Sequence, residues 1–81
     1  MYLELVTPDK KVFEGEVDSV KMPGSLGGFE VLDHHAALIS SLGEGKVVIR
    51  AKEGLEYTID GGVAEVKNNK VIILAETLVE A

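Results

Sequence analysis

The sequence predicts an all-β protein, a single antiparallel β-sandwich of about ten short strands that spans residues 1–81. Three observations lead to this fold class. Apolar and polar residues alternate with a period of two, which is the pattern of strands with one buried face. Glycine, proline and asparagine recur roughly every eight residues, as turns between short strands require. A chain of 81 residues has room for one small core, so we expect one domain.

In the first part of the chain, the alternation is clearest at Leu3–Leu5 and at Phe29–Val31, where a glutamate separates two apolar residues. Turns are expected between the strands, because glycine, asparagine and proline tolerate the backbone angles of turns. The turn points in order are Pro8-Asp9, Gly15, Pro23-Gly24, Gly27-Gly28, Gly43-Glu44-Gly45, Lys52-Glu53-Gly54, Gly61-Gly62 and Asn68-Asn69. These boundaries predict nine strands and leave a tenth open.

In the second half, Leu55, Tyr57 and Ile59 alternate with polar residues and predict another strand. Asn68-Asn69 lies between two apolar runs and predicts a two-residue hairpin turn. The β-branched run Val71–Ile73 then favours a strand that continues to about Ala75. The apolar spacing there also fits a helix, so residues 77–81 are left open between strand and helix.

Composition and charge exclude several function classes. Fourteen acidic residues against eight basic ones give a net charge of −6, which disfavours nucleic acid and anionic lipid surfaces. The longest apolar run, Val71–Ala75, is far shorter than the roughly 20 residues of a membrane-spanning helix, so no direct membrane insertion is expected. The absence of cysteine excludes disulfides and thiol chemistry. The N-terminus shows no signal or transit peptide pattern, so we expect a cytosolic chain that is used as translated.

Asp33, His34 and His35 form the most suggestive chemical cluster, because imidazole and carboxylate groups bind metals and histidine is a common general base. Their spacing argues against a site. Adjacent residues in an extended chain point to opposite faces, and the sequence has no third histidine. We therefore expect no metal and no catalytic residue here, with one histidine in a structural or interface role.

Two further motifs have simpler explanations than catalysis. Glu14, Glu16 and Asp18 would project from one face of a strand, where charges commonly protect a sheet edge from pairing. The glycine-rich segment Gly24–Gly28 places Ser25 next to the first glycine, one position too early for a nucleophile elbow. It also fits neither phosphate-binding glycine motif, so a turn is expected and no cofactor or small-molecule ligand.

The alternative function is a stand-alone β-sandwich module, either an interaction module or a carrier domain of the biotinyl or lipoyl type, because carrier domains are β-sandwiches of similar size. Lys21-Met22 matches half of their Met-Lys-Met signature. Val20 precedes the lysine and Pro23-Gly24 follows closely, so the segment predicts a strand end in place of a symmetric hairpin tip.

The order of motifs along the whole chain resembles the N-terminal sandwich domain of the epsilon subunit family of bacterial proton-translocating ATP synthases. That family has a strand and turn before Phe-x-Gly, a Pro-Gly or Thr-Gly, a glycine-containing loop, a strand, a Gly-His-Ala-Pro-Leu-like segment, Leu-x-x-Gly and Gly-Gly-x-x-Glu-Val. The matching segments here are Leu3–Pro8, Val12–Gly15, Pro23-Gly24, Gly27-Gly28, Phe29–Leu32, His34–Leu38, Leu42–Gly45 and Ile59–Val66. One departure is His34–Ala37, which lacks the family's glycine and proline but keeps a histidine at His35.

The resemblance implies a rotor component of the central stalk with no catalytic activity of its own. In this family the sandwich packs against the gamma subunit and touches the ring of c subunits, so that ring rotation reaches the catalytic head during proton-driven ATP synthesis. By position, two loops would face the ring and the stalk base, namely Gly24, Ser25, Leu26, Gly27 and Gly28, and His34, His35 and Ala36. The residues expected to face gamma from the next strand are Leu38, Ser40 and Leu42.

The family usually continues into a C-terminal helical hairpin that inhibits ATP hydrolysis and, in some members, binds ATP. The sequence ends at Ala81, before such a hairpin, so neither property is expected of this chain. The resemblance further implies a peripheral position on the cytoplasmic face of the bacterial inner membrane, as part of the ATP synthase complex.

Overall fold

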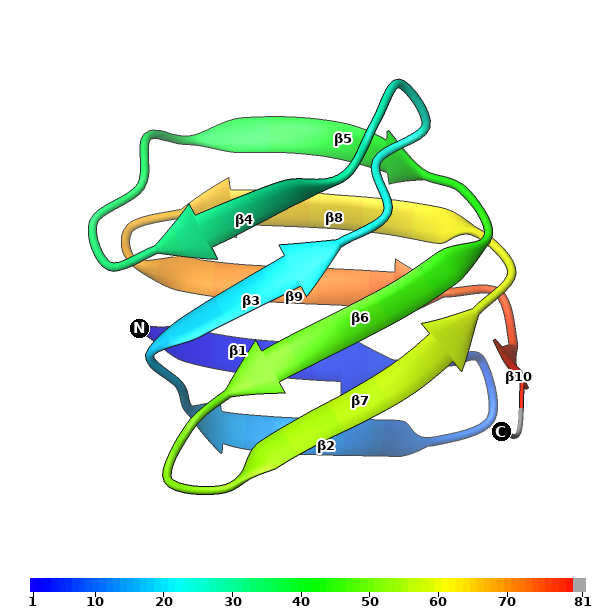
Figure 1. Cartoon of the computed structure of the whole chain (residues 1–81), viewed down its shortest axis with the longest axis horizontal. Coiled ribbons are helices and arrows are strands. Elements are labelled where there is room, and N and C mark those ends of the chain that lie inside the picture. The colour runs from blue at the N-terminus through cyan, green and yellow to red at the C-terminus, as the bar shows by residue number, and fades with distance from the viewer. Residues whose placement is uncertain (80–81) are drawn as a thin grey trace.

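The computed structural model describes residues 1–79, which form ten β-strands in two five-stranded sheets packed face to face (Figure 1). Sheet A contains, in spatial order, β2 (Lys11–Glu16), β1 (Tyr2–Val6), β9 (Lys70–Ala75), β8 (Gly62–Lys67) and β5 (Leu38–Leu42). Sheet B contains β10 (Leu78–Val79), β7 (Gly54–Ile59), β6 (Gly45–Arg50), β3 (Ser19–Met22) and β4 (Phe29–Leu32). The predicted all-β sandwich is confirmed.

Neighbouring strands are antiparallel with one exception. β1 lies parallel to β9, with Leu3 opposite Val71 and Leu5 opposite Ile73. The chain can make this pair because β1 and β9 are far apart in sequence, which gives the long crossover that parallel strands need. β1 thereby joins the β2 hairpin to the centre of sheet A.

The core lies between the sheets and is filled by the inward residues of the alternating strands. Leu3 and Leu5 of β1 are fully buried and lie beside Val71 and Ile73 of β9. Sheet B contributes buried aliphatic side chains from four strands, namely Val20, Met22, Val31, Val47, Ile49 and Ile59. The alternation in the sequence therefore reports burial directly, because successive side chains of a strand point to opposite faces.

The hairpin between β8 and β9 turns at Asn68 and Asn69, which have φ angles of 53° and 61°. Asparagine tolerates this left-handed conformation better than most residues, so the predicted two-residue turn is confirmed. After β9 the chain enters β10, where Leu78 lies opposite Ile59 and Val79 opposite Thr58. The open choice for residues 77–81 is therefore a strand at 78–79, while residues 80–81 lie outside the described part of the chain.

Each sheet has two edge strands, and each edge strand of sheet A lies on the same side of the molecule as one edge strand of sheet B. β4 and β5 are edge strands on one side of the molecule, at the top of Figure 1, and we call this the β4–β5 side. β2 and β10 are the opposite edge strands, and we call theirs the β2–β10 side. No helix in residues 1–79 is long and apolar enough to cross a membrane.

Candidate functional site

The glycine-rich loop, residues 23–28, connects β3 to β4 and is bound to the edge of β5. The amide of Ser25 donates to the carbonyl of Ser41 at 3.0 Å, and the amide of Gly43 donates to the carbonyl of Pro23 at 2.8 Å. These bonds flank a single antiparallel bridge between Gly24 and Leu42. The loop therefore links the edge of sheet A to the end of β3 in sheet B.

Two glycines of this loop are required by its geometry. A Cβ at Gly24 would lie 2.5 Å from the carbonyl oxygen of Gly27 and 2.9 Å from the ring of Phe29. Gly27 has a φ of 137°, in the region that favours glycine. Between them Leu26 is fully exposed at the loop tip. A leucine held away from the core on a hydrogen-bonded turn is available to a partner.

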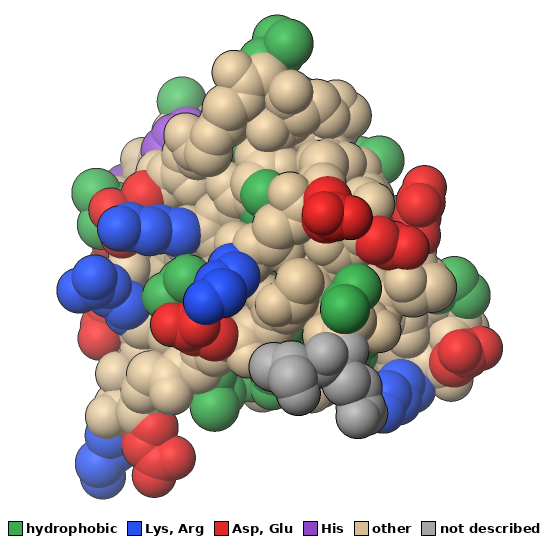
Figure 2. Space-filling view, turned by 45° about the vertical axis from the view of Figure 1, so that its right-hand side comes forward, with side chains coloured by type: hydrophobic (Ala, Val, Ile, Leu, Met, Phe, Trp, Pro, Cys, Tyr) green, Lys and Arg blue, Asp and Glu red, His purple; other side chains and the backbone are tan. Residues whose placement is uncertain are grey.

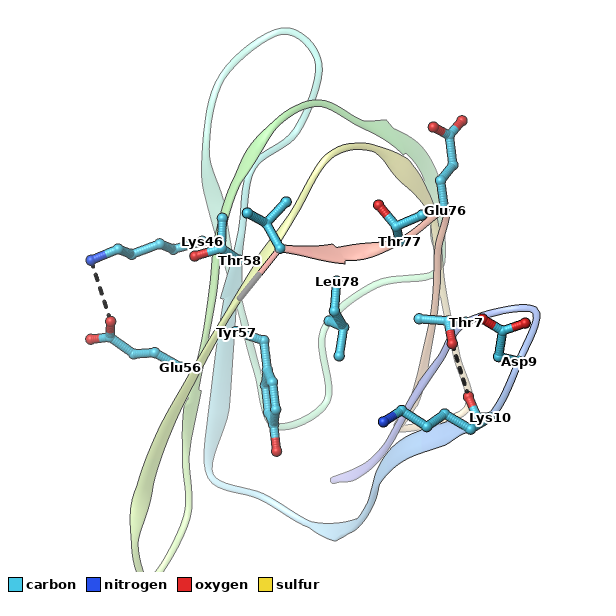
Figure 3. A pocket seen from close by; sticks show the side chains of 11 residues that line it. Thr7, Asp9, Lys10, Lys46, Glu56, Tyr57, Thr58, Glu76, Thr77 and Leu78 are labelled. Carbon is cyan, nitrogen blue, oxygen red and sulfur yellow. Dashed lines mark hydrogen bonds and ion pairs between the residues drawn. The ribbon is translucent and has the colours of Figure 1, made fainter. Parts of the chain in front are cut away.

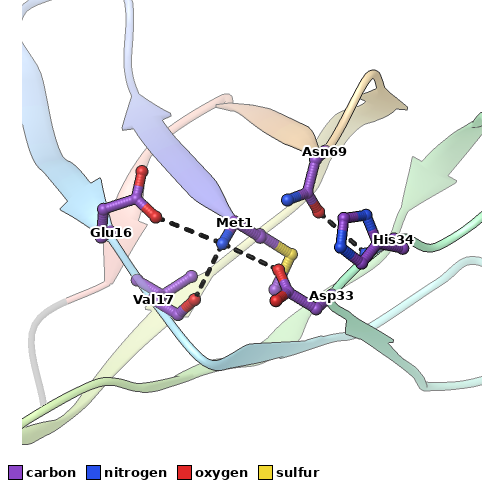
Figure 4. A network of polar contacts seen from close by, with 6 residues as sticks. All are labelled: Met1, Glu16, Val17, Asp33, His34 and Asn69. Carbon is purple, nitrogen blue, oxygen red and sulfur yellow. Dashed lines mark hydrogen bonds and ion pairs between the residues drawn. The ribbon is translucent and has the colours of Figure 1, made fainter.

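The predicted histidine segment forms the connection from β4 to β5. His34 has a φ of 62° and is held there by its amide, which donates to Oδ1 of Asn69 at 2.8 Å (Figure 4). The amide of His35 donates to the carbonyl of Leu32 at 3.1 Å, and its Nδ1 lies 2.7 Å from the carbonyl of Ala36. His35 is half-buried, whereas His34 and Ala36 are exposed.

Asp33 is engaged by the start of the chain. The α-amino group of Met1 lies 2.9 Å from Oδ1 of Asp33 and 3.3 Å from Oε1 of Glu16, and it donates to the carbonyl of Val17 at 3.4 Å (Figure 4). The bond from this ammonium, followed by one from Asn69, lowers the pKa of the Asp33 carboxyl. The bond to Asp33 raises the pKa of the amino group. Asp33 therefore has a structural role, because its ion pair with Met1 holds the start of the chain, just before β1, against the segment after β4.

The histidine cluster does not assemble into a metal site in the described residues. Within residues 1–79 no three His, Cys, Asp or Glu side chains come close enough to hold an ion. Asp33 faces the Met1 ammonium, and Nδ1 of His35 faces a backbone carbonyl. These contacts fit the structural role that the spacing of the two histidines predicts.

The strand β5 carries the residues that were expected to face gamma. Leu38, Ser40 and Leu42 point toward the core, and Leu42 is only 5% exposed. The outward side of the strand carries Ile39, which is 74% exposed, and Ser41. The register explains this, because Ser40 lies opposite the buried Ala64 and Ile39 opposite the exposed Glu65. A partner that approaches sheet A from outside meets Ile39 and Ser41.

Ile39 belongs to a larger aliphatic surface on the outer face of sheet A. Val63 and Leu74 are exposed and lie directly opposite each other across β8 and β9, with Val6 of β1 next in the same row. Ile39 lies one row away, beside Glu65. The predicted interface segments and this aliphatic surface therefore meet along β5.

The β2–β10 side has a different chemistry. On edge strand β2, the Lys11 ammonium lies 3.1 Å from Oε1 of Glu14, and the hydroxyl of Tyr2 donates to the other oxygen of Glu14. This bond raises the pKa of Tyr2 to about 12 and, together with Lys11, lowers the pKa of Glu14. Glu14 and Glu16 lie on the edge strand as the edge-protection hypothesis requires, whereas Asp18 lies beyond it.

A hollow of about 550 Å³ opens on this side, between the turn after β1 and strands β7 and β10 (Figure 3). Tyr57 and Leu78, both half-buried, line it. Its rim mixes acidic and basic side chains, and Lys46 is already paired with Glu56 at 3.4 Å. Figure 2, in which the right-hand side of Figure 1 comes forward, shows basic side chains mostly on the left beside acidic ones and a group of acidic side chains at the upper right. The rim does not present groups of one charge to a single ligand.

The structure does not favour the hypothesis of a biotinyl or lipoyl carrier domain. Lys21 lies within β3, where it is paired with Glu30 of β4 and Val48 of β6. A lysine flanked by strands on both sides is not at the tip of a hairpin, where the carrier domains hold their modified lysine.

Sequence reasoning missed the long-range contacts of this region. Neither the ion pair of Met1 with Asp33 nor the bond from His34 to Asn69 has a local signal, because the partners are more than thirty residues apart. The exposure of Ile39 follows from the register of β5 with β8, which the segment itself does not contain. The adjacent apolar residues Leu38 and Ile39 left the inward face ambiguous.

Comparison with known proteins identifies the family. Residues 1–81 match the family model described as "ATP synthase, Delta/Epsilon chain, beta-sandwich domain". The ATP synthase epsilon chain of Maridesulfovibrio salexigens is 44% identical over 82 residues, which cover 100% of this chain and 58% of that one. The epsilon chain of Caulobacter vibrioides is 43% identical over 84 residues, covering 100% of this chain and 95% of that one. The chain thus spans less than three fifths of some curated relatives and nearly all of another.

Solved structures with the same fold come from mitochondrial ATP synthases. The chain aligns with a TM-score of 0.87 and 25% identity to a chain in the OSCP/F1/c-ring structure from Euglena gracilis, over 95% of this chain and 51% of that one. The central stalk/c-ring structure from Tetrahymena thermophila gives a TM-score of 0.84 at 19% identity, over 98% of this chain and 65% of that one, and supports the fold alone. The resemblance inferred from the order of motifs is confirmed. The chain belongs to the ATP synthase delta/epsilon chain family, and residues 1–81 constitute its β-sandwich domain.

Proposed function

We propose that this chain is a non-catalytic subunit of the central stalk of a proton-translocating ATP synthase. In that role it turns with the rotor and couples rotation of the ring of c subunits to the gamma subunit and the catalytic head. The observation that carries the proposal is the match of residues 1–81 to the family's sandwich domain, together with more than 40% identity to curated epsilon chains.

The architecture is suited to transmitting force. Each strand inside a sheet is hydrogen-bonded on both sides, and the core between the sheets is continuous. Loops along the β4–β5 side are hydrogen-bonded to sheet A, Ser25 to Ser41 of strand β5 and His34 to Asn69 in the turn between β8 and β9. Well-packed interiors have low compressibility and transmit strain, so load on these loops reaches both sheets.

The interface of this proposal lies on the β4–β5 side. The loop of residues 24–28, with Leu26 at its tip, and the half-buried His35 contact the ring and the base of the stalk. β5 faces gamma through Ile39 and Ser41, which replace the inward residues of the same strand. The complex holds the chain peripherally on the cytoplasmic face of the bacterial inner membrane.

The absence of catalysis in this proposal is supported by the way the candidate groups are used. Asp33 is paired with an ammonium, the ring of His35 faces a backbone carbonyl, and Lys21 is inside a sheet. In the hollow on the β2–β10 side, Lys46 is paired with Glu56, and the hydroxyl of Thr7 donates to the carbonyl of Lys10.

The test is restoration of coupling. Inverted membrane vesicles from the source cell are stripped of their own epsilon chain, the purified chain is added back, and ATP synthesis driven by a proton gradient is measured. We expect the chain to rebind and to restore synthesis. His35→Ala is expected to require a several-fold higher concentration, on the order of 3- to 10-fold, because a half-buried interface side chain is lost.

Lys52→Ala is the matched control, because Lys52 is exposed in the turn between β6 and β7, away from the β4–β5 side. It should restore synthesis as well as the unchanged chain. Failure of the unchanged chain to bind the stripped complex, or binding with no effect on coupling, would contradict the proposed function.

A further inference from the structure

The four edge strands of the sandwich are not equally closed to pairing with another chain. β2 carries Lys11, Glu14 and Glu16, and its pairing with β1 is irregular between Leu5 and Val6. β4 carries Glu30 at its centre. β5, with the sequence LISSL, has no charged residue along its length, and β10 is also uncharged but has only two residues. Charges and irregular pairing are the usual means of blocking an exposed edge, so β5 is unusually bare.

Half of this edge is already covered by the chain itself. The carbonyl of Ser41 accepts from the amide of Ser25, and the amide of Gly43 donates to the carbonyl of Pro23. These backbone groups of Ser41 and Gly43 therefore point away from β8. In an antiparallel ladder this direction alternates along the strand. The amide and carbonyl of Ile39, two residues before Ser41, therefore also point away from β8.

The other half of the edge is open. Among residues 1–79, the backbone of Ile39 makes no hydrogen bond outside the sheet ladder, and its side chain is 74% exposed. Ala37, two residues earlier, precedes the strand and is exposed. The loop contact at Gly24 thus ends where a row of free backbone donors and acceptors begins.

We propose that residues 37–39 are a strand-addition site, at which an extended, uncharged segment of the stalk partner continues sheet A beyond β5. This inference rests on the proposed function for the identity of the partner. Main-chain bonds to the edge would supply affinity, and alternate side chains would supply specificity.

The surroundings define the chemistry of the added segment. Its outward side chains would lie beside Ile39 and extend the aliphatic surface formed with Val63 and Leu74. Its inward side chains would approach Leu38 and Phe29, which are half-buried against the core at this side. An apolar segment is therefore favoured on both of its faces, and a charged one would be desolvated without a partner.

Hydrogen exchange of the Ile39 amide tests this most directly and needs no variant. The chain is measured free and bound to ATP synthase stripped of its own epsilon chain. We expect the Ile39 amide to exchange rapidly in the free chain and at least about 10-fold more slowly in the complex, as a newly bonded strand requires. Continued rapid exchange in a complex that has formed would overturn strand addition and leave the proposed function intact.

Ile39→Pro provides a second measurement. It removes the amide that points off the edge while sparing the bonds of the flanking residues to β8. We expect about a 10-fold or greater loss of affinity for the stripped complex, against less than about 3-fold for Ile39→Val, which keeps the amide and most of the side chain. Equal affinity of a folded Ile39→Pro variant and the unchanged chain would overturn the proposal.

Two other outcomes would also overturn it. If the Ile39 amide becomes protected as the free chain is concentrated, and sedimentation shows dimers, the edge is occupied by a second copy. If the unchanged chain does not bind the stripped complex, the proposed function fails and strand addition to a stalk partner fails with it.

Discussion

The two open sides of the sandwich differ in the chemistry of their exposed edge strands. On the β2–β10 side, the longer edge strand, β2, carries Lys11 and Glu14, which form an ion pair with each other. On the β4–β5 side, β4 carries Glu30 but edge strand β5 is uncharged, and Leu26 and Ile39 are among the most exposed aliphatic side chains of the molecule. An edge that must stay free needs charge, whereas an edge that will be covered in a complex does not. The difference supports the proposed interface on the β4–β5 side without reference to any relative.

The largest expected effect separates the two faces of β5. Leu42→Ala removes a side chain that is 5% exposed, and it should lower the free energy of unfolding by about 2–4 kcal/mol. Ile39→Ala, three residues earlier on the outward face, should change it by no more than about 0.5 kcal/mol. Urea denaturation of both variants checks this. Similar losses for the two variants would mean that β5 is not oriented as described.

The next effect concerns the loop that covers half of the β5 edge. Gly24→Ala would place a methyl group against the carbonyl of Gly27 and the ring of Phe29, so the loop must shift away from β5. We expect a loss of about 1–3 kcal/mol in the free energy of unfolding and faster exchange of the Gly43 amide. Gly54→Ala is the control, because its Cβ would meet no atom within 4 Å. A Gly24→Ala variant as stable as Gly54→Ala would contradict the close packing of this loop.

A smaller effect is expected from removing charge on the opposite edge. Glu14→Val with Glu16→Val leaves β2 with apolar side chains in place of its carboxylates, which makes this edge resemble β5. Concentration-dependent self-association should appear in sedimentation, because the electrostatic block to edge pairing is gone. Glu53→Val with Glu44→Val gives the same change in net charge at exposed turn positions and should leave the chain monomeric. If both double variants associate, the change in net charge alone would explain the self-association, and the edge position of Glu14 and Glu16 would not matter.

The smallest effect is on the pH dependence of stability. The folded pKa of Asp33 lies below its ordinary value of 3.8, so its contribution is present above that value and is lost as the pH falls through the folded pKa. The amino group of Met1 has a folded pKa above 8.0, so its contribution is present below pH 8 and is lost as the pH rises through the folded value.

In the Asp33→Asn variant, the melting temperature should therefore depend less on pH, at both ends of the pH range, than it does in the unchanged chain. Thermal melts between about pH 2 and pH 10 measure this. Asp9→Asn is the control, because it changes an exposed carboxylate in the turn after β1. Asp60→Asn is unsuitable, because Asp60 accepts a hydrogen bond from the amide of Thr77. Parallel pH profiles for Asp33→Asn and the unchanged chain would contradict a structural role for the ion pair.

The sequence predicted the fold class because its strands bury one face and its turns contain asparagine and glycine at positions that need them. Leu3 and Leu5 are buried as their alternation indicates, and Asn68 and Asn69 form the expected turn. The parallel pairing of β1 with β9 had no local signal, because both partners alternate in the same way as antiparallel strands.

The sequence predicted the segments of the proposed interface but not their contacts. The two loops expected at the interface do lie on one side of the molecule, joined to β5 by the bonds of Ser25 and by the chain from His35. The residues expected to face gamma, Leu38, Ser40 and Leu42, lie on the inward face of β5. The adjacent apolar residues Leu38 and Ile39 leave this face ambiguous in the sequence. A register set by β8 decides that face, and this is a tertiary contact that the segment alone does not contain.

The central claim is that the β4–β5 side, and not the β2–β10 side, meets the rest of the ATP synthase. Because the chain has no cysteine, a single introduced cysteine carries one photo-crosslinker at one place. Leu26→Cys probes the β4–β5 side, and Lys10→Cys, in the turn before β2, probes the other. After rebinding to the stripped complex and illumination, we predict that Leu26→Cys crosslinks to a subunit of the stalk or ring and that Lys10→Cys does not. Crosslinking from Lys10→Cys alone would contradict the account.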